Sequence, residues 1–252
     1  MQAWTEPVLV MALDERDDQQ TREDSGEFSQ LYNMSGFRAR GQYLGFVTQF
    51  RYRELDGESA GDQSKSDGPI DVQLVHSRDG MTRHRCEDRP PVIANGPYDC
   101  DTGCILGVAN APVIVDDEMW IYYTGITTTH GGSLPEKKIT FCRGSWGLDR
   151  MASLDAGENT SVVETRPFEP DGTKLVINAD SRGGRLRVEV LDKSGEVFPG
   201  FGKADCVALQ ENSLCSAVIW QRNLKLPEQG SIWLRFSMER TSLYSYCVQD
   251  AA

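Results

Sequence analysis

Short apolar runs, each bounded by glycine, aspartate, asparagine or proline, recur along this chain and leave little room for long helices. No long segment keeps apolar residues at the spacing of an amphipathic helix. Several runs instead alternate apolar with polar side chains, as Ile70, Val72 and Leu74 do with Asp71 and Gln73. This pattern is typical of sandwiches, barrels and propellers. We therefore predict an all-β protein.

Four strand-like runs precede Gly80, and a similar order of runs follows it. The expected matches pair residues 7–10 with 90–93, 31–37 with 105–115, 43–50 with 120–124, and 70–76 with 138–143. Residues 4–80 and 81–146 therefore look like two copies of one unit, with a period of roughly 75 residues. A four-stranded antiparallel unit that repeats around an axis is a propeller blade. The sequence thus predicts a partial β-propeller of about two blades over residues 1–147.

Two polar stretches lengthen this repeat. Residues 14–27 are rich in acidic side chains and follow an expected strand at 8–13. Residues 53–68 are rich in glycine, serine and aspartate. Because such composition is typical of exposed loops, we expect a loop in both places.

The pattern of the sequence changes at about residue 147. After a connector over 148–157, strand-like runs are expected at 161–165, 173–179, 184–191, 231–238 and 242–248. Leu186, Val188 and Val190 alternate with polar neighbours, and residues 192–195 match a hairpin turn. One buried face per strand over roughly 100 residues is typical of a β-sandwich. We predict a C-terminal β-sandwich domain over residues 148–252.

The stretch from residue 95 to residue 132 offers the most chemistry. The β-branched run Val113–Val115 precedes an acidic turn at 116–118, and an aromatic-rich return strand follows at 119–123. In an antiparallel hairpin, the start of the first strand and the end of the second lie at one edge. We therefore expect Asp99 and Asp101 to share a rim with residues 127–130, the last of which is His130.

Charge and hydropathy exclude several classes of partner. The formal net charge is −12 and the sequence pI is about 4.8, which disfavours nucleic acid and anionic membrane surfaces. No apolar run approaches the roughly 20 residues of a membrane span. The N-terminal stretch lacks a basic region and an A-x-A-like cleavage site, so the sequence predicts no signal peptide and leaves the location open.

The seven cysteines predict no metal site. The only close pair, Cys100 and Cys104, has no second pair at metal-ligand spacing. An odd number of cysteines in a chain of this length favours packed, reduced thiols, although one disulfide remains open for an exported protein. A phosphate-cradling glycine loop and a dinucleotide fingerprint are also missing, so we predict no cofactor.

A turn motif suggests that the chain is part of a longer protein. Residues 77–80, Ser-Arg-Asp-Gly, match the first half of an inter-blade motif S-x-D-G-x-x-W, in which Arg83 stands at the Trp position. The opening residues from Trp4, Trp-Thr-Glu-Pro, resemble the end of the same motif without its first half. The sequence therefore predicts an N-terminally truncated fragment, with a core aromatic role for Trp4 as the alternative.

Six segments carry a resemblance to a known group of enzymes. They are 70–80 (IDVQLVHSRDG), 98–103 (YDCDTG), 118–125 (EMWIYYTG), 145–157 (SWGLDRMASLDAG), 175–190 (LVINADSRGGRLRVEV) and 199–201 (PGF). With these segments the chain resembles the C-terminal half of a five-bladed β-propeller glycosidase, of the glycoside hydrolase family 32 and 43 type, with an appended β-sandwich. The resemblance implies a carbohydrate substrate or ligand.

The resemblance also implies a site. Proteins of this type place carboxylates around a central pocket, where one protonates the leaving oxygen and another attacks carbon or activates water. Asp101 precedes an innermost-type strand, and Glu27 stands in the comparable stretch of the preceding unit, so these two are the candidate catalytic residues. The candidate substrate-binding residues are Asp99, His130, Tyr98 and Tyr32.

Each candidate also has a structural interpretation. Asp99 and Asp101 match turn residues, Glu27 matches a solvated charge, and His130 matches an exposed loop histidine. The leading hypothesis for the chain is a glycosidase-type protein, and the second is a non-catalytic glycan-binding module. The third is a structural protein that docks a partner through residues 160–249.

Overall fold

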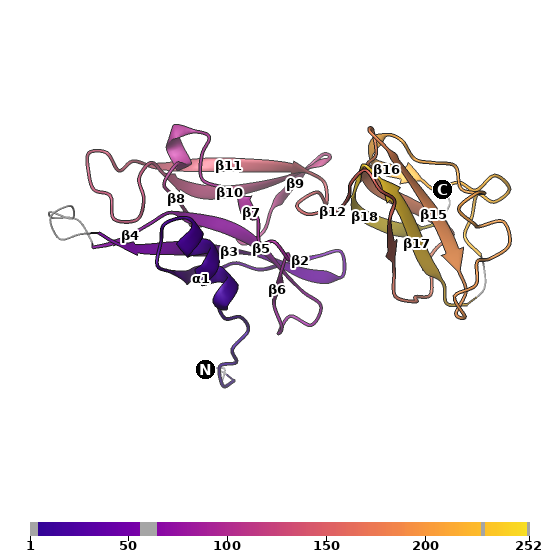
Figure 1. Cartoon of the computed structure of the whole chain (residues 1–252), viewed down its shortest axis with the longest axis horizontal. Coiled ribbons are helices and arrows are strands. Elements are labelled where there is room, and N and C mark those ends of the chain that lie inside the picture. Colours follow the sequence, from indigo (N-terminus) through magenta and orange to yellow (C-terminus); the bar gives the residue numbers. More distant parts are fainter. Residues whose placement is uncertain (1–4, 56–64, 228–229, 251–252) are drawn as a thin grey trace. The chain divides into compact units, whose positions relative to one another are not determined.

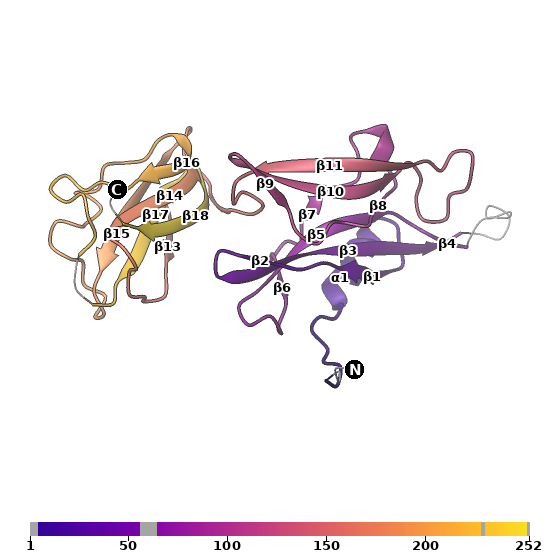
Figure 2. The same ribbon diagram turned by 180° about the vertical axis from the view of Figure 1, so that it is seen from behind.

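The structure, a computed structural model, describes residues 5–55, 65–227 and 230–250. Strands make up 48% of the chain and helices 5%, which confirms the predicted predominance of β-structure. The strands form several sheets, and none of the sheets in the described ranges is closed. The chain divides into two compact units, Met1–Ser145 and Trp146–Ala252, drawn in Figure 1 and from behind in Figure 2. No helix among the described residues is long and apolar enough to cross a membrane.

One large sheet dominates the first unit. Its main path runs β1-β3-β5-β8-β10-β11, while β2 and β4 pair with β3, β6 and β7 with β5, and β9 with β10. The bounds of the strands and of the 3-10 helix η1 are β1 Phe28–Met34, β2 Phe37–Ala39, β3 Gln42–Glu54, β4 Ser66–Asp67, β5 Ile70–Ser77, β6 His84–Arg85, β7 Pro91–Ile93, η1 Asp99–Asp101, β8 Cys104–Leu106, β9 Val113–Val115, β10 Glu118–Ile126 and β11 Ile139–Gly147.

This sheet consists of two antiparallel groups joined at one point. Strands β1, β3 and β5 are antiparallel neighbours, as are β8, β9 and β10. A parallel bridge between Ile70 and Cys104 links the groups. Phe50 and Ile126 pack with these two residues as one buried apolar cluster, so the junction has its own small core. The division of the unit into two propeller blades stays a prediction.

The loop predicted over residues 14–27 is wrong for most of that stretch. Helix α1 spans Glu15–Glu23 and begins with a capping box. In it, the Asp14 side chain accepts from the Asp17 amide, and the Asp17 side chain accepts from the Asp14 amide (2.9 Å). Asp14 also accepts a hydrogen bond from the Arg16 amide (3.0 Å). The buried face of α1 carries Asp17 and Thr21. Because that face is polar, a search for apolar helical periodicity misses the helix.

Two strand predictions are also wrong. Residues 8–13 form no strand with any described residue, and the Val8 and Leu9 side chains are exposed. The expected strand over 105–115 is instead divided between β8 and β9, because Gly107 has a φ of +56° and turns the chain out of extended geometry. Strand β7, which corresponds to the run expected at 90–93 in the second repeat, pairs with β5 of the first antiparallel group. Trp4 lies outside the described residues.

Two sheets contribute side chains to one buried apolar cluster in the second unit. One has the order β12-β18-β14-β16 and the other β13-β17-β15. Core side chains come from both sheets: Leu175 and Ile177 face Val188 and Phe236 across one buried cluster. The strand bounds are β12 Leu154–Ala156, β13 Ser161–Glu164, β14 Lys174–Asp180, β15 Arg185–Leu191, β16 Asn212–Ala217, β17 Trp233–Glu239 and β18 Thr241–Gln249.

The alternation in β15 follows the predicted pattern. Leu186, Val188 and Val190 are fully buried, whereas Arg187 and Glu189 between them are only half-buried. All five runs expected as strands correspond to strands of this unit. Strand β12 lies within the expected connector and β16 was not predicted, because its sequence, NSLCSA, has too little apolar alternation to identify a strand.

Candidate functional site

The segment around η1 lies beside the end of β10 and the loop after it. The Gly103 amide donates to the Ile126 carbonyl (3.0 Å), and the Thr102 hydroxyl donates to the Thr127 carbonyl (2.8 Å). These contacts extend the antiparallel pairing of β8 with β10. The structure therefore brings residues 99–103 next to residues 126–127.

Asp101 is buried at this junction, with 2% of its surface exposed. Its Oδ2 accepts a hydrogen bond from the Tyr123 hydroxyl (2.7 Å). Its Oδ1 is buried and has no hydrogen-bond partner among the described residues. Burial, followed by the neighbouring Asp101 carboxylate, raises the pKa of Tyr123 above its usual range, so this phenol stays protonated.

Asp99 and Tyr98 lie on the outside of the same segment. Both are exposed, and Asp99 lines an open groove of about 470 Å³ together with Thr102, Thr127 and Lys138. Among the described residues, the side chains of Asp99 and Tyr98 make no contact with the buried Asp101 carboxylate. The backbone of η1 is what links them to it. Asp99 and Asp101 are therefore only two residues apart in the sequence but face different surroundings.

His130 contacts Tyr32, which lies 98 residues earlier in the chain. The Tyr32 hydroxyl oxygen is 2.5 Å from His130 Nε2, and His130 Nδ1 is 3.2 Å from the Ser66 carbonyl oxygen. A carbonyl oxygen only accepts, so Nδ1 carries the proton, and in the neutral ring Nε2 accepts from Tyr32. The pair thus leaves the lone pairs of the Tyr32 oxygen available to a further donor.

An ion pair that the sequence did not reveal fixes the loop carrying His130. Asp67 Oδ1 accepts from the Gly131 amide (2.9 Å), and Oδ2 is 2.7 Å from Arg53 Nη2. Burial disfavours the charged carboxylate, but hydrogen bonds from Thr129, Arg53 and the Gly131 amide outweigh it and lower the pKa of Asp67 to about 2. Asp67 lies in a polar stretch expected to be a loop, and nothing in its local sequence marks it.

Aromatic rings surround the Tyr32–His130 pair. Phe28 stacks on Tyr52 with ring centroids 4.4 Å apart, and buried Phe50 lies 5.6 Å from Tyr32 and 4.9 Å from His130. Phe28 is 36% exposed and Tyr32 is 45% exposed. We call Phe28, Tyr32, Tyr52 and His130, over Phe50, the aromatic surface. It combines partly exposed rings with two polar side-chain tips.

Glu27 precedes Phe28 of the aromatic surface, but its carboxylate is hydrogen-bonded to the backbone. Its amide donates to the Tyr52 carbonyl (2.7 Å), and its Oε1 accepts from the Glu54 amide (2.9 Å). The carboxylate therefore satisfies a backbone donor at the end of β3. No hydrogen bond, ion pair or groove joins Glu27 to Asp101 in the described parts of the chain. No group of three or more His, Cys, Asp or Glu side chains among the described residues is arranged to hold a metal ion.

Comparisons with known proteins add little to this geometry. No model of a known protein family matches the sequence. No curated protein matches it either. Among solved structures, the chain is similar to "a putative glycoside hydrolase from Parabacteroides distasonis", with 14% identity and a TM-score of 0.28. The alignment covers 71% of this chain but only 55% of that protein. Similarity at this level establishes neither the arrangement of the sheets nor an activity.

Proposed function

We propose that this chain binds a neutral carbohydrate at the aromatic surface. The observation that carries the proposal is the Tyr32–His130 contact at the border of partly exposed rings. A sugar ring has an apolar face and a rim of hydroxyl groups. Aromatic side chains with one polar end offer the matching combination of flat apolar area and hydrogen-bonding groups.

The polar half of the recognition comes from Tyr32. Since the Tyr32 hydroxyl donates its hydrogen bond to His130 Nε2, the Tyr32 oxygen is free to accept from a sugar hydroxyl. The apolar half comes from Phe28, whose ring stacks on the ring of Tyr52 and is partly exposed. The acidic net charge of the chain is compatible with a neutral ligand.

Native affinity gels with starch, xylan, galactan and inulin test this proposal. One of these neutral polysaccharides is expected to retard the chain, and Phe28→Ala and Tyr32→Ala are expected to weaken binding by roughly tenfold or more. Phe141→Ala is the matched control, because Phe141 is a 75% exposed aromatic residue on β11. An equal effect of Phe28→Ala and Phe141→Ala would contradict the assignment, as would no retardation by any of the four.

Hydrolysis of a glycosidic bond is the second candidate function. It is favoured by the buried Asp101 Oδ1, which has no partner among the described residues and so has capacity for a substrate or a proton. Glycoside hydrolysis needs two carboxylates, and Glu27 is the other candidate. Loss of reducing-sugar release in both Asp101→Asn and Glu27→Gln, with binding retained, would support this role. Unchanged release in either variant would remove that residue from the mechanism.

A further inference from the structure

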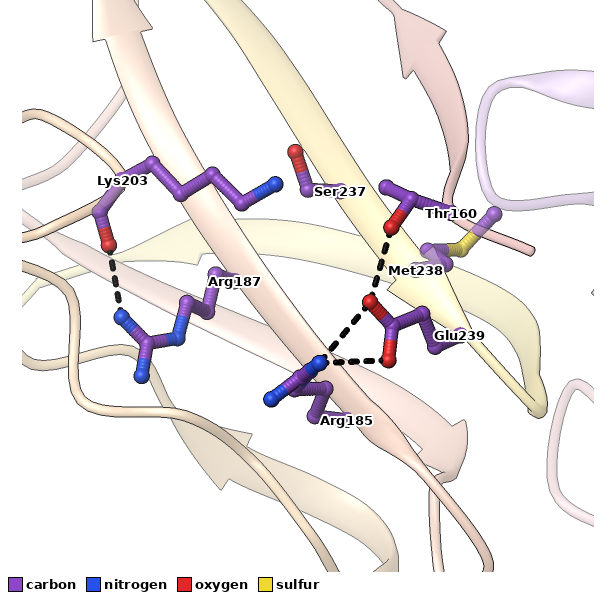
Figure 3. A pocket seen from close by; sticks show the side chains of 7 residues that line it. All are labelled: Thr160, Arg185, Arg187, Lys203, Ser237, Met238 and Glu239. Atoms are coloured by element: carbon purple, nitrogen blue, oxygen red, sulfur yellow. Dashed lines mark hydrogen bonds and ion pairs between the residues drawn. The ribbon is translucent and has the colours of Figure 1, made fainter. Parts of the chain in front are cut away.

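A groove of about 290 Å³ lies on the second unit, over the sheet β13-β17-β15. Figure 3 shows its side chains, among them Thr160, Arg185, Arg187, Lys203, Ser237 and Glu239. Cationic groups outnumber anionic ones here, although the whole chain has a net charge of −12. Charges more than about 8 Å away are largely screened at physiological salt, so the local excess decides what the groove attracts.

The register of the sheet places these groups on one face. Arg185 lies opposite Glu239, and Arg187 lies opposite Ser237, in the antiparallel pairing of β15 with β17. Alternate residues of a strand share a face. The core side chains of β15, such as Val188, occupy the other face. The groove is therefore a regular product of the sheet and not of an irregular loop.

The single carboxylate in the groove is already paired. Glu239 Oε1 accepts from the Thr160 hydroxyl (2.7 Å), and Glu239 Oε2 lies 2.7 Å from Arg185 Nη2. The Thr160 hydrogen bond and then Arg185 lower the pKa of Glu239, so it stays charged. Arg185 and Glu239 thus compensate each other, and the remaining positive charge comes from Arg187 and Lys203.

Arg187 is held in place but keeps free donors. Its Nη1 donates to the Lys203 carbonyl (3.0 Å), which anchors one nitrogen of the guanidinium. Arg187 Nε and Nη2 and the Lys203 ammonium make no hydrogen bond or ion pair with any residue that the structure describes. In Figure 3 the Lys203 side chain extends in the direction of Ser237. One edge of a guanidinium presents two parallel N–H groups, which match a carboxylate.

We propose that this groove binds the carboxylate of a uronic acid residue in an acidic saccharide. Arg187 takes the carboxylate through its free edge, Lys203 adds a second cation, and Ser237 offers a hydroxyl. The groove volume lies just below the range for ligand pockets, which begins at about 300 Å³, and suits one sugar ring. The saccharide class rests on the proposed carbohydrate binding, whereas the preference for a carboxylate rests on the groove.

Isothermal titration calorimetry of the whole chain tests the proposal with three separate probes: trigalacturonate, neutral galactotriose and inorganic sulfate. Trigalacturonate is expected to bind at least tenfold more tightly than the other two. Arg187→Gln should weaken its binding roughly tenfold or more, and Lys203→Gln several-fold. Arg182→Gln and Lys193→Gln remove exposed cations of the same unit outside the groove and should change nothing. Arg187→Lys keeps the charge but loses the two parallel N–H groups of the guanidinium. Its affinity for trigalacturonate should lie between those of the parent chain and Arg187→Gln.

Three results would overturn the proposal: trigalacturonate binding unchanged in Arg187→Gln, equal binding of galactotriose, or equal binding of sulfate. Circular dichroism melting of each variant shows that a loss of binding is not a loss of folding. Binding of trigalacturonate that depends on Arg187 but not on Phe28 would support the groove even if the aromatic surface binds no neutral glycan. If a neutral glycan binds in a way that depends on Phe28 but trigalacturonate does not bind, the proposed site in the groove is refuted and the aromatic surface is not.

Discussion

Asp101 and His130 lie in neighbouring segments, but the fold uses their hydrogen-bonding groups differently. Both ring nitrogens of His130 are engaged, by Tyr32 and by the Ser66 carbonyl. Asp101 has one oxygen bonded to Tyr123 and one buried oxygen without a described partner. A buried carboxylate that is only half satisfied is costly. Asp101 therefore bears on both stability and the second candidate function, whereas His130 positions the exposed Tyr32.

Tyr123→Phe tests the Asp101 contact through pH. The raised pKa of Tyr123 means that the fold favours the neutral phenol, so its stabilisation is complete below the unfolded pKa of about 10 and is lost as pH rises above it. At pH 7 the variant is expected to lose about 1–2 kcal/mol in urea unfolding. This difference should shrink above about pH 10.

The neighbouring Tyr122→Phe is the control for that experiment, because Tyr122 stacks on Phe141 and is only half-buried. Spectrophotometric titration should show one tyrosine, missing in Tyr123→Phe, that ionises last. A Tyr123→Phe variant as stable as the parent at pH 7 would contradict the contact.

At the scale of elements, helix α1 is held to the sheet by charge and not by apolar packing. Asp17 is fully buried, Arg85 Nη2 donates to its Oδ2 (2.7 Å), and Arg89 Nη1 lies 2.9 Å from its Oδ1. Gln49 and Ser29 continue the network across β1 and β3, joined by a 2.8 Å hydrogen bond. A polar helix face of this kind is stable only while every charge has its partner.

Asp17→Ala should therefore cost about 3–5 kcal/mol in urea unfolding, because it leaves the buried Arg85 guanidinium without its carboxylate, whereas Arg89 keeps its ion pair with Asp14. Asp88→Ala is the matched control. Asp88 pairs with Arg16 at the surface, and its loss should cost less than about 1 kcal/mol. Similar costs for the two variants would show that α1 is not held by this network.

Two thiols meet across β10. Cys100 in η1 and Cys142 in β11 have sulfur atoms 3.6 Å apart, and both are half-buried. Gly125 of β10 lies between them: a Cβ there would be 2.9 Å from Cys142 Sγ and 2.7 Å from the Cys100 carbonyl oxygen. Glycine at this position is what lets the two segments approach.

Oxidised glutathione should therefore close one intramolecular disulfide between Cys100 and Cys142, releasing two equivalents of reduced glutathione. Peptide mapping should find this link and no other. Cys104 should stay reduced, since its side chain is buried. Cys142→Ser serves as the control, and an unchanged yield of disulfide in that variant would contradict the pairing.

At the scale of the whole molecule, each unit has its own core. The apolar cluster to which both sheets of the second unit contribute is built from residues of that unit. The cluster of Phe50, Ile70, Cys104 and Ile126 belongs wholly to the first. Two separate cores predict two unfolding events.

Differential scanning calorimetry of Leu234→Ala tests this separation. Leu234 is fully buried in the second core, and its truncation should cost about 3 kcal/mol and lower one of two transitions. Leu224→Ala, at an exposed site, should leave both transitions in place. A single transition that shifts as a whole in Leu234→Ala would contradict independent units.

The sequence predicted the β class because period-two alternation at Leu186, Val188 and Val190 directly encodes burial in β15. In β5 the alternation identified the strand but not its exposure, because Asp71 and Gln73 are buried along with Ile70, Val72 and Leu74. It did not predict α1, because Asp17 and Thr21 make its buried face polar, and no apolar period marks such a helix. The expected strand over 105–115 is interrupted after Leu106, where Gly107 has a positive φ, and pairing resumes only at Val113.

Only the part of the candidate site that joins segments close together in the sequence could be predicted. Hairpin logic alone suggested that the η1 segment and the end of β10 share an edge. Contacts across long sequence separation, such as Tyr32 with His130 and Asp67 with Gly131, depend on pairing between distant strands. Phe28 and Tyr52 were not recognised because their exposure follows from the register of β1 with β3. Composition does not encode that register.

The most direct test of carbohydrate binding is hydrogen-exchange mass spectrometry of the whole chain with and without a saturating neutral polysaccharide from the affinity gels. We expect slower exchange in peptides covering residues 28–34 and 127–132, since these carry Tyr32 and His130. Peptides of β11 around Phe141 should be unchanged. Protection confined to other parts of the chain, or none at all under saturating ligand, would contradict a carbohydrate site at the aromatic surface.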